Sequence, residues 1–254
     1  MILTVDIGNT NIVLGGFDGD QLHFVSRLST NHATTEDEYA VTIWDILSLH
    51  SVGRTHFEGA IVSSVVPKLL PVLKKAIKKR LGCQVLSIGP GIKTGVNIKT
   101  DDPSVLGADF VCAAAGVMAH YPLPAIVVDL GTATKIFALQ EKGVFLGTAI
   151  MPGVNISLDA LASRTAQLPH ISIEGTPPVI GTNTVDSMQS GIIYGTAASI
   201  DGMVELYQQE LGINSTVIAT GGLASSIIPH CRKAIILDSD LILKGLLSIY
   251  RKNS

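Results

Sequence analysis

The chain has 254 residues, of which 46% are hydrophobic, so it can bury the core of one large domain or of two small ones. Its 18 basic and 21 acidic residues give a formal net charge of −3, and no aromatic run is interleaved with basic residues. This balance is typical of a globular protein and argues against nucleic acid as a partner.

The N-terminal part alternates predicted strands and helices. An apolar stretch that carries Asp6 opens the chain without a basic n-region, which predicts a strand and not a signal peptide. Apolar residues at helical spacing, with acidic residues in the first turn, predict a helix over 35–50. A buried strand is expected over 59–66, followed by a helix over 68–81 whose dense basic run has the spacing of a solvated face. Another strand is expected over 84–88.

The rest of the chain continues the alternation. A long apolar helix is expected over 103–120, and its apolar run is shorter than the roughly 18 residues that a membrane span needs. Further helices are predicted over 155–166, 184–211 and 240–251, and a strand over 216–219. Strands that alternate with helices predict an α/β protein with mixed or parallel sheets, and we expect no contact with a membrane.

One internal repeat organises the sequence. The stretch 3–14 and the stretch 126–137 each contain a β-branched run, an Asp-x-Gly turn and a second apolar run. Each is typical of a strand, a tight glycine turn and a second strand. The repeat predicts two similar halves, 1–122 and 123–254, that pack closely with a cleft between them.

Asp-x-Gly turns at matching positions indicate phosphate binding. Glycine lets the backbone approach a phosphate, while N–H groups and short polar side chains supply donors. A carboxylate repels phosphate, so Asp6 and Asp129 are useful only through a metal ion or by holding a water or hydroxyl. The alternative is a pair of structural hairpin turns in which each Asp caps backbone N–H groups. The candidate phosphate-binding residues are Gly8, Asn9, Thr10, Asn11, Gly131 and Thr132.

Two other features complete the candidate site. Gly221 and Gly222 follow the predicted strand over 216–219 and leave room for a flat ligand such as adenine with its ribose, although such a pair is more often only a turn. Asp109, at the start of the helix over 103–120, is the candidate general base. Its alternative role is to stabilise the N-terminus of that helix.

Cysteines and histidines offer no competing chemistry. Cys83, Cys112 and Cys231 lie far apart and form no CxxC pair, which predicts reduced thiols in a cytoplasmic protein. The seven histidines are scattered, without the spacing of metal ligands or of a nucleophile with its base.

The motifs resemble those of type III pantothenate kinases, a family of the actin-like kinase superfamily, over essentially the whole chain. The matching stretches are 6–11, 35–39, 63–67, 89–95, 107–109, 129–134, 152–153, 164–169, 183–184, 187–191 and 219–222. The resemblance implies duplicated actin-like (RNase H-like) domains with mixed sheets flanked by helices. It also implies ATP-dependent phosphorylation of pantothenate to 4′-phosphopantothenate, the first step of coenzyme A biosynthesis.

The resemblance further implies Mg²⁺, a monovalent cation (K⁺ or NH₄⁺) and a homodimer with the active site near the subunit interface. In this comparison Asp109 is similar to the catalytic base, Asp6 to the carboxylate on the Mg²⁺ side, and Asp129 to the acid that accompanies the monovalent cation. Gly107, Ala108 and Thr184 are similar to substrate contacts.

The chain departs from the family in the acceptor half of the site. Phe110 stands where the family has an Arg that pairs with the pantothenate carboxylate, and Thr100 stands where it has a Tyr that helps to hold pantothenate. Lys135 replaces a usual Thr at the end of the second turn motif. Lys135 has three interpretations: a substitute for the monovalent cation, a contact for the substrate carboxylate, or a surface lysine.

Three functions therefore stay open. The chain is a pantothenate kinase with a rebuilt acid-binding corner, a kinase for a related small hydroxyl substrate without the same carboxylate, or a nucleotide-binding paralogue that has lost catalysis and serves regulation or a partner. The expected small-molecule partner is pantothenate or a related small hydroxy acid. The presence of Asp6, Asp109 and Asp129 favours the two enzymes.

Overall fold

The computed structural model describes residues 1–53 and 55–254, which form two compact units. Unit 1 comprises Met1–Val96, Asp102–His120 and Leu241–Ser254, and unit 2 comprises Asn97–Asp101 and Tyr121–Asp240. The C-terminal segment thus belongs to the unit that the N-terminus begins, whereas the repeat placed it in the half 123–254. The bounds 1–122 and 123–254 for the two halves of the repeat stay a prediction.

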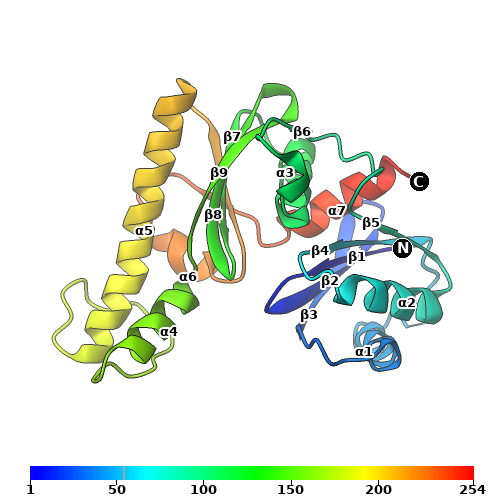
Figure 1. Cartoon of the computed structure of the whole chain (residues 1–254), viewed down its shortest axis with the longest axis horizontal. Coiled ribbons are helices and arrows are strands. Elements are labelled where there is room, and N and C mark those ends of the chain that lie inside the picture. The colour runs from blue at the N-terminus through cyan, green and yellow to red at the C-terminus, as the bar shows by residue number, and fades with distance from the viewer. Residues whose placement is uncertain (54) are drawn as a thin grey trace. The chain divides into compact units, whose positions relative to one another are not determined.

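Unit 1 is built on a five-stranded sheet in the order β3-β2-β1-β4-β5 (Figure 1). Strands β1 (Ile2–Ile7), β2 (Asn11–Asp18) and β3 (Gln21–Ser29) form an antiparallel meander. Strands β4 (Gly59–Ser64) and β5 (Gln84–Ser87) extend the sheet in parallel on the other side of β1. They confirm the strands predicted over 59–66 and 84–88, and β4 is buried as expected, whereas β5 at the edge of the sheet is only partly buried.

Helices cover both faces of this sheet. On one face, α1 (Glu36–Leu49) and α2 (Leu69–Leu81) pack in a core with β1 and β4. On the other, α3 (Ala108–His120) and α7 (Leu241–Arg251) pack in a second core that contains Ile61 of β4. Along β4, Ala60 and Val62 lie in the first core and Ile61 in the second, as the period of two in a strand requires.

The predicted helix over 103–120 is divided in the structure. Pro103–Val105 forms a short 3-10 turn (η1), and Asp102 caps it by accepting a hydrogen bond from Ser104 N at 2.9 Å. Helix α3 then begins at Ala108. This break places Asp109 in the first turn of α3, where a helix favours a carboxylate.

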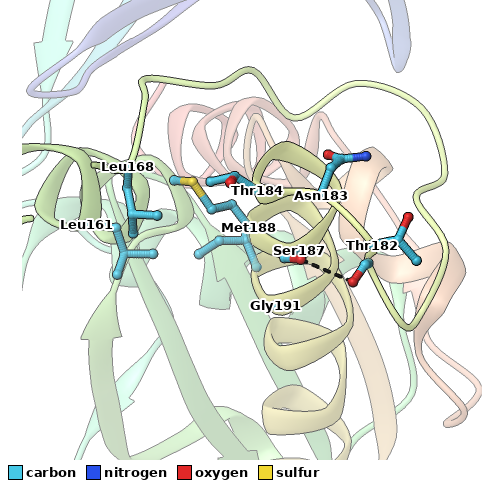
Figure 2. A pocket seen from close by; sticks show the side chains of 10 residues that line it. Leu161, Leu168, Thr182, Asn183, Thr184, Ser187, Met188 and Gly191 are labelled. Carbon is cyan, nitrogen blue, oxygen red and sulfur yellow. Dashed lines mark hydrogen bonds between the residues drawn. The ribbon is translucent and has the colours of Figure 1, made fainter. Parts of the chain in front are cut away.

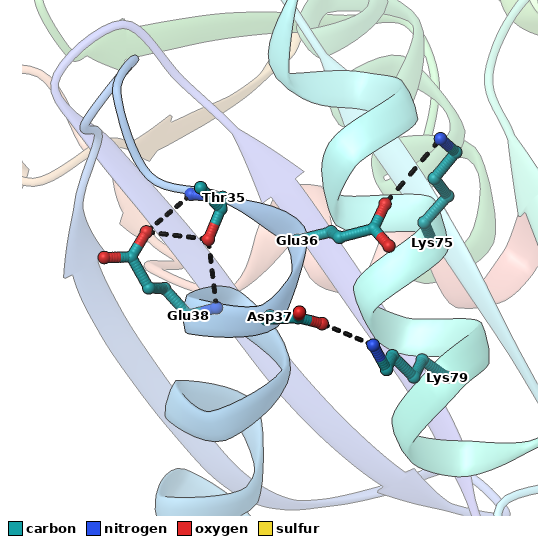
Figure 3. A network of polar contacts seen from close by, with 6 residues as sticks. All are labelled: Thr35, Glu36, Asp37, Glu38, Lys75 and Lys79. Atoms are coloured by element: carbon teal, nitrogen blue, oxygen red, sulfur yellow. Dashed lines mark hydrogen bonds and ion pairs between the residues drawn. The ribbon is translucent and has the colours of Figure 1, made fainter.

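The start of α1 shows how local sequence fixes a helix end. Thr35 Oγ1 accepts a hydrogen bond from Glu38 N, and Glu38 Oε2 accepts one from Thr35 N at 2.7 Å, which is a capping box (Figure 3). Two ion pairs link this turn to the basic face of α2: Glu36–Lys75 and Asp37–Lys79. Both pairs are largely exposed, so they contribute little stability beyond the cap itself.

Unit 2 repeats the strand order of unit 1. Its six-stranded sheet has the order β11-β10-β7-β8-β9-β6, in which β9-β8-β7-β10-β11 corresponds to β3-β2-β1-β4-β5. The strands are β6 (Asn97–Ile98), β7 (Ala125–Leu130), β8 (Ala133–Gln140), β9 (Val144–Pro152), β10 (Thr216–Thr220) and β11 (Ile236–Leu237). Helical turn η2 (Glu141–Gly143) joins β8 to β9. The shared order and the mixed strand directions confirm the predicted duplicated α/β fold.

One face of this second sheet is covered by helices α4 (Val154–Arg164), α5 (Thr184–Leu211) and α6 (Ala224–Ile227), followed by the 3-10 turn η3 (Ile228–His230). Helix α5 has the bounds that the sequence predicts, because Asn183 caps its start and Gly212 ends it with a φ of 67°. Among the residues that the structure describes, no helix is both long and apolar enough to cross a membrane.

Candidate active site

The first Asp-x-Gly turn joins β1 to β2 and is open to solvent. Gly8 N donates to Asn11 O at 2.9 Å, and a Cβ on Gly8 would lie 2.9 Å from the same oxygen, so the turn requires glycine. Thr30 braces the turn, because its Oγ1 donates to Gly8 O at 2.7 Å and its N donates to Thr10 O at 2.9 Å. Asn9, Thr10 and Asn11 are exposed, as donors to a phosphate must be.

Asp6 and Asp109 lie in the same neighbourhood of unit 1. Burial is the largest cause that raises the pKa of the Cys112 thiol on α3, and the charges of Asp6 and Asp109 raise that pKa further. Asp6 of β1 stands beside Ser63 of β4 in the parallel register, and Cys112, about one turn after Asp109 on α3, packs in one core with Ile61 of the same strand. The fold therefore brings the predicted base and the carboxylate of the first turn together within one unit.

The segment around Asp109 leaves its carboxylate partly exposed. Asp109 Oδ1 accepts a hydrogen bond from Phe110 N at 2.9 Å, and a Cβ on Gly107 would clash with this oxygen. Gly107 and Ala108 are also partly exposed. The Phe110 residue, in contrast, is only 8% exposed, so its ring belongs to the core. We expected Phe110 to line the acceptor site, and its burial leaves little surface for such a contact.

The second Asp-x-Gly turn, Gly131 and Thr132, joins β7 to β8 and lies against the glycine pair. Gly221 has a φ of +97°, and a Cβ there would lie 2.5 Å from the carbonyl carbon of Leu130 and 2.7 Å from Asp129 Oδ1. Glycine is therefore required at this contact. The predicted nucleotide loop and the second phosphate turn are neighbours within unit 2. Thr132 is exposed, as is the second glycine of the pair, Gly222.

Lys135 forms a buried ion pair with the carboxylate of the second turn. Its Nζ lies 2.7 Å from Asp129 Oδ2, and the exposed fractions of the two side chains are 14% and 10%. The antiparallel register of β7 and β8 places Asp129 directly opposite Lys135, so both side chains project from the same face of the sheet. The interpretation of Lys135 as a surface lysine is therefore wrong.

An open pocket of about 700 Å³ lies at the N-terminus of α5 (Figure 2). Thr184, the predicted substrate contact, is the first residue of α5 and lines this pocket. Aliphatic and polar side chains share the lining, which suits a small amphipathic molecule. The other lining residues are Leu161, Leu168, Gly181, Thr182, Asn183, Ser187, Met188, Gly191 and Ile192. The sequence assigned none of these nine to the site, although five of them lie in the matching stretches 164–169, 183–184 and 187–191, because only the fold brings α4, the following loop and α5 together.

The remaining predicted acceptor residue, Thr100, follows β6 in unit 2. Its Oγ1 is buried, without a hydrogen-bond partner among the described residues. Within residues 1–53 and 55–254, no group of three or more His, Cys, Asp or Glu side chains is placed so that it could hold a metal ion by itself.

Comparisons with known proteins agree on one family. The type III pantothenate kinase family matches residues 2–206. The type III pantothenate kinase of Halalkalibacterium halodurans is 44% identical over 253 residues, covering 100% of both chains. That of Brevibacillus brevis is 42% identical, covering 100% of this chain and 99% of the relative.

Solved structures show the same fold. The activator of 2-hydroxyisocaproyl-CoA dehydratase from Clostridium difficile, with bound ADPNP, superposes with a TM-score of 0.54. The two sequences are 14% identical, and the superposition covers 98% of this chain and 93% of the activator. At this identity the similarity concerns the fold alone.

Proposed function

The chain belongs to the type III pantothenate kinase family, and from this premise we propose that it transfers the γ-phosphoryl group of ATP to the primary hydroxyl of pantothenate. The products are 4′-phosphopantothenate and ADP, and the reaction is the first step of coenzyme A biosynthesis. The observation that carries the proposal is that β1, which carries Asp6 beside the first turn, and α3, which carries Asp109, both contact β4 in unit 1. This arrangement supplies a base close to a phosphate-binding turn.

Asp109 is the proposed general base. As the hydroxyl oxygen of the acceptor attacks the γ-phosphorus, the Asp109 carboxylate takes the hydroxyl proton and the bond to the β,γ-bridging oxygen breaks. The partial exposure of Asp109 leaves it accessible to an acceptor. In unit 1 the first Asp-x-Gly turn offers phosphate its backbone N–H groups and the side chains of Asn9 and Thr10. In unit 2 the second turn, with Thr132, and the Gly221 loop offer donors of the same kind.

The residues of the first turn fit Mg²⁺. This ion, when bound to nucleotide phosphates, needs only one or two protein carboxylates and keeps several waters, so no larger ligand cluster is required. Asp6 stands at the end of β1, beside the exposed turn, with its Oδ1 buried from solvent. We assign Asp6 to hold Mg²⁺, which supplies neutralisation of the charge on the phosphates.

The pocket that Thr184 lines is our candidate binding site for the acceptor. Its aliphatic wall suits methyl and methylene groups, and its polar wall suits hydroxyl and amide groups. A Thr184→Val substitution should therefore raise the KM for pantothenate more than it lowers kcat. Thr42→Val, on α1 in unit 1, where Thr42 Oγ1 donates to Glu38 O at 2.8 Å, is a control that should leave KM unchanged.

We further propose that the protein is a cytoplasmic homodimer. The dimer follows from the family resemblance, and sedimentation of the purified protein tests it. Cys83, Cys112 and Cys231 are free, which suits a reducing compartment. Burial raises the pKa of Cys231 to about 11, so its thiol is mostly protonated and unreactive near neutral pH.

The direct test is an assay of purified protein with ATP, Mg²⁺ and pantothenate. We expect equal amounts of ADP and 4′-phosphopantothenate, and no ADP above background without pantothenate. Asp109→Asn should be inactive, whereas Asp45→Asn, an exposed carboxylate of α1 in the same unit, should retain the wild-type rate.

Because Phe110 is buried and replaces the Arg that binds the pantothenate carboxylate in the family, an acceptor without that carboxylate can distinguish the alternative functions. Pantetheine lacks the carboxylate that the family's Arg binds, so turnover of pantetheine but not of pantothenate would identify a kinase for a different acceptor. ATP binding without turnover of either compound would identify a nucleotide-binding paralogue.

A further inference from the structure

The ion pair between Lys135 and Asp129 occupies the place where the family resemblance implies a monovalent cation. One Asp129 oxygen, Oδ2, lies 2.7 Å from Lys135 Nζ. The other, Oδ1, faces the backbone of Gly221 and Gly131 closely enough that an added Cβ would lie 2.7 Å and 3.4 Å from it. A free cation would meet the positive charge of Lys135 at the first oxygen and closely packed backbone at the second. Asp129 therefore does not fit a resident K⁺ or NH₄⁺.

The position of the ammonium group is fixed by the sheet. Asp129 and Lys135 are direct cross-strand neighbours, and the two-residue turn of Gly131 and Thr132 sets this register. Both side chains are largely buried, so swinging Lys135 away would leave a buried carboxylate without its counter-charge, which is costly. This cost argues against the interpretation in which Lys135 leaves Asp129 to bind the carboxylate of the acceptor.

We infer that the Lys135 ammonium serves as a built-in monovalent cation beside the second phosphate turn, so that phosphoryl transfer by this chain requires no added K⁺ or NH₄⁺. The inference rests on the proposed function for its kinetic consequence. Lys135 acts as a positioning residue: it neutralises Asp129 and holds the carboxylate against the turn and the Gly221 loop. A lysine ammonium is a compact point charge, comparable in charge to the ion that it replaces.

The test compares KCl, NH₄Cl and choline chloride at a constant ionic strength of about 0.1 M, so that general screening is the same. Wild-type turnover and ADP affinity should be equal in the three salts. Lys135→Thr leaves space beside Asp129, so its turnover should fall roughly 10-fold or more in choline chloride and recover in KCl. Lys135→Met fills the space without charge, and its turnover should stay low in all three salts.

Lys233→Thr is the matched control. Lys233 is another ion-paired lysine of unit 2, 3.6 Å from Glu205, but its side chain is 34% exposed. The Lys233→Thr protein should show the flat cation response of wild type. A K⁺ response in this control would indicate a general salt effect, which would overturn the interpretation of the Lys135→Thr result.

Thermal unfolding and ADP titration give readouts that do not depend on turnover. KCl should raise the Tm of Lys135→Thr by about 2–4 °C relative to choline chloride and leave the wild-type Tm unchanged, because only the variant gains a bound ion. If wild type turns over no acceptor in any salt, the proposed function fails, while these two readouts still decide the role of Lys135.

Two results would overturn the inference. One is a wild-type protein whose turnover or ADP affinity depends on K⁺. The other is a folded Lys135→Thr protein whose turnover, Tm and ADP affinity show no response to K⁺. If Lys135→Thr does not fold, two results still overturn the inference: wild-type turnover that depends on K⁺, or a folded Lys135→Met protein with wild-type turnover in choline chloride.

Discussion

The two Asp-x-Gly turns share a sequence pattern and a strand order, but their carboxylates face different partners. In unit 1, Asp6 stands directly opposite Val13. In unit 2, Asp129 stands directly opposite Lys135. The first carboxylate thus faces an apolar side chain, and the second is neutralised by a buried lysine.

The cause is the length of each turn. Residues 8–10 lie between β1 and β2, whereas only residues 131–132 lie between β7 and β8. One residue more or less changes which residue of the second strand stands opposite the carboxylate, and the period of two then decides which side chains share its face. Similar motifs at equivalent positions can therefore provide different chemistry: the proposed Mg²⁺ carboxylate in one unit and an internal ion pair in the other.

The largest effect should come from Asp109, the proposed base, which lies in the same unit as the first turn. Asp109→Asn should lower kcat by roughly 10²- to 10⁴-fold, because the acceptor hydroxyl loses its base, and should leave ADP affinity unchanged. Single-turnover kinetics and an ADP titration measure the two quantities. Near-normal turnover of the variant would show that the base is another group.

The same substitution in the two turns should have two different outcomes. Asp6→Asn should cut turnover roughly 10²-fold through weaker Mg²⁺ binding while leaving the fold stable. Asp129→Asn should instead destabilise the protein by about 3–5 kcal/mol, because it leaves the ammonium of Lys135 buried and unpaired. Urea denaturation and Mg²⁺ titration of activity distinguish the two.

The double variant Asp129→Asn with Lys135→Met is the control for this comparison. It removes both charges, so it should regain most of the stability that Asp129→Asn loses. If the double variant is as unstable as the single one, the ion pair is not the reason for the loss.

Gly221 should show how closely the second turn is packed. Gly221→Ala forces a side chain onto a residue with positive φ and against the backbone of Leu130, and should cost about 1–3 kcal/mol of stability and weaken ADP binding. Gly202→Ala, inside α5 with no atom within 4 Å of the added Cβ, should instead gain up to about 1 kcal/mol. Chemical denaturation of both variants measures the contrast, and equal behaviour would refute it.

The smallest effect should come from placing a lysine opposite Asp6, in the way that Lys135 stands opposite Asp129. Val13→Lys places an ammonium opposite Asp6, where it should compete with Mg²⁺ and raise the apparent Kd for Mg²⁺ roughly 10-fold. Val13→Met controls for the change in size. An unchanged Mg²⁺ dependence of Val13→Lys turnover would contradict the assignment of Asp6.

The sequence by itself determined the local elements and the family. The capping residue Thr35 and the Asn183 and Gly212 ends of α5 act within a few residues, so the helix bounds could be read directly. The two Asp-x-Gly turns were equally local, and their duplication predicted the repeated strand order that both sheets show.

Only the tertiary structure decided where the side chains of the site go. The direction of Lys135 depends on a cross-strand register that strand alternation cannot give across a turn. The burial of Phe110, the membership of α7 in unit 1 and the placement of Asp6 and Asp109 on elements that both contact β4 depend on packing between residues far apart in sequence. Such contacts leave no local pattern, because each requires the sheet and its helices to be assembled first.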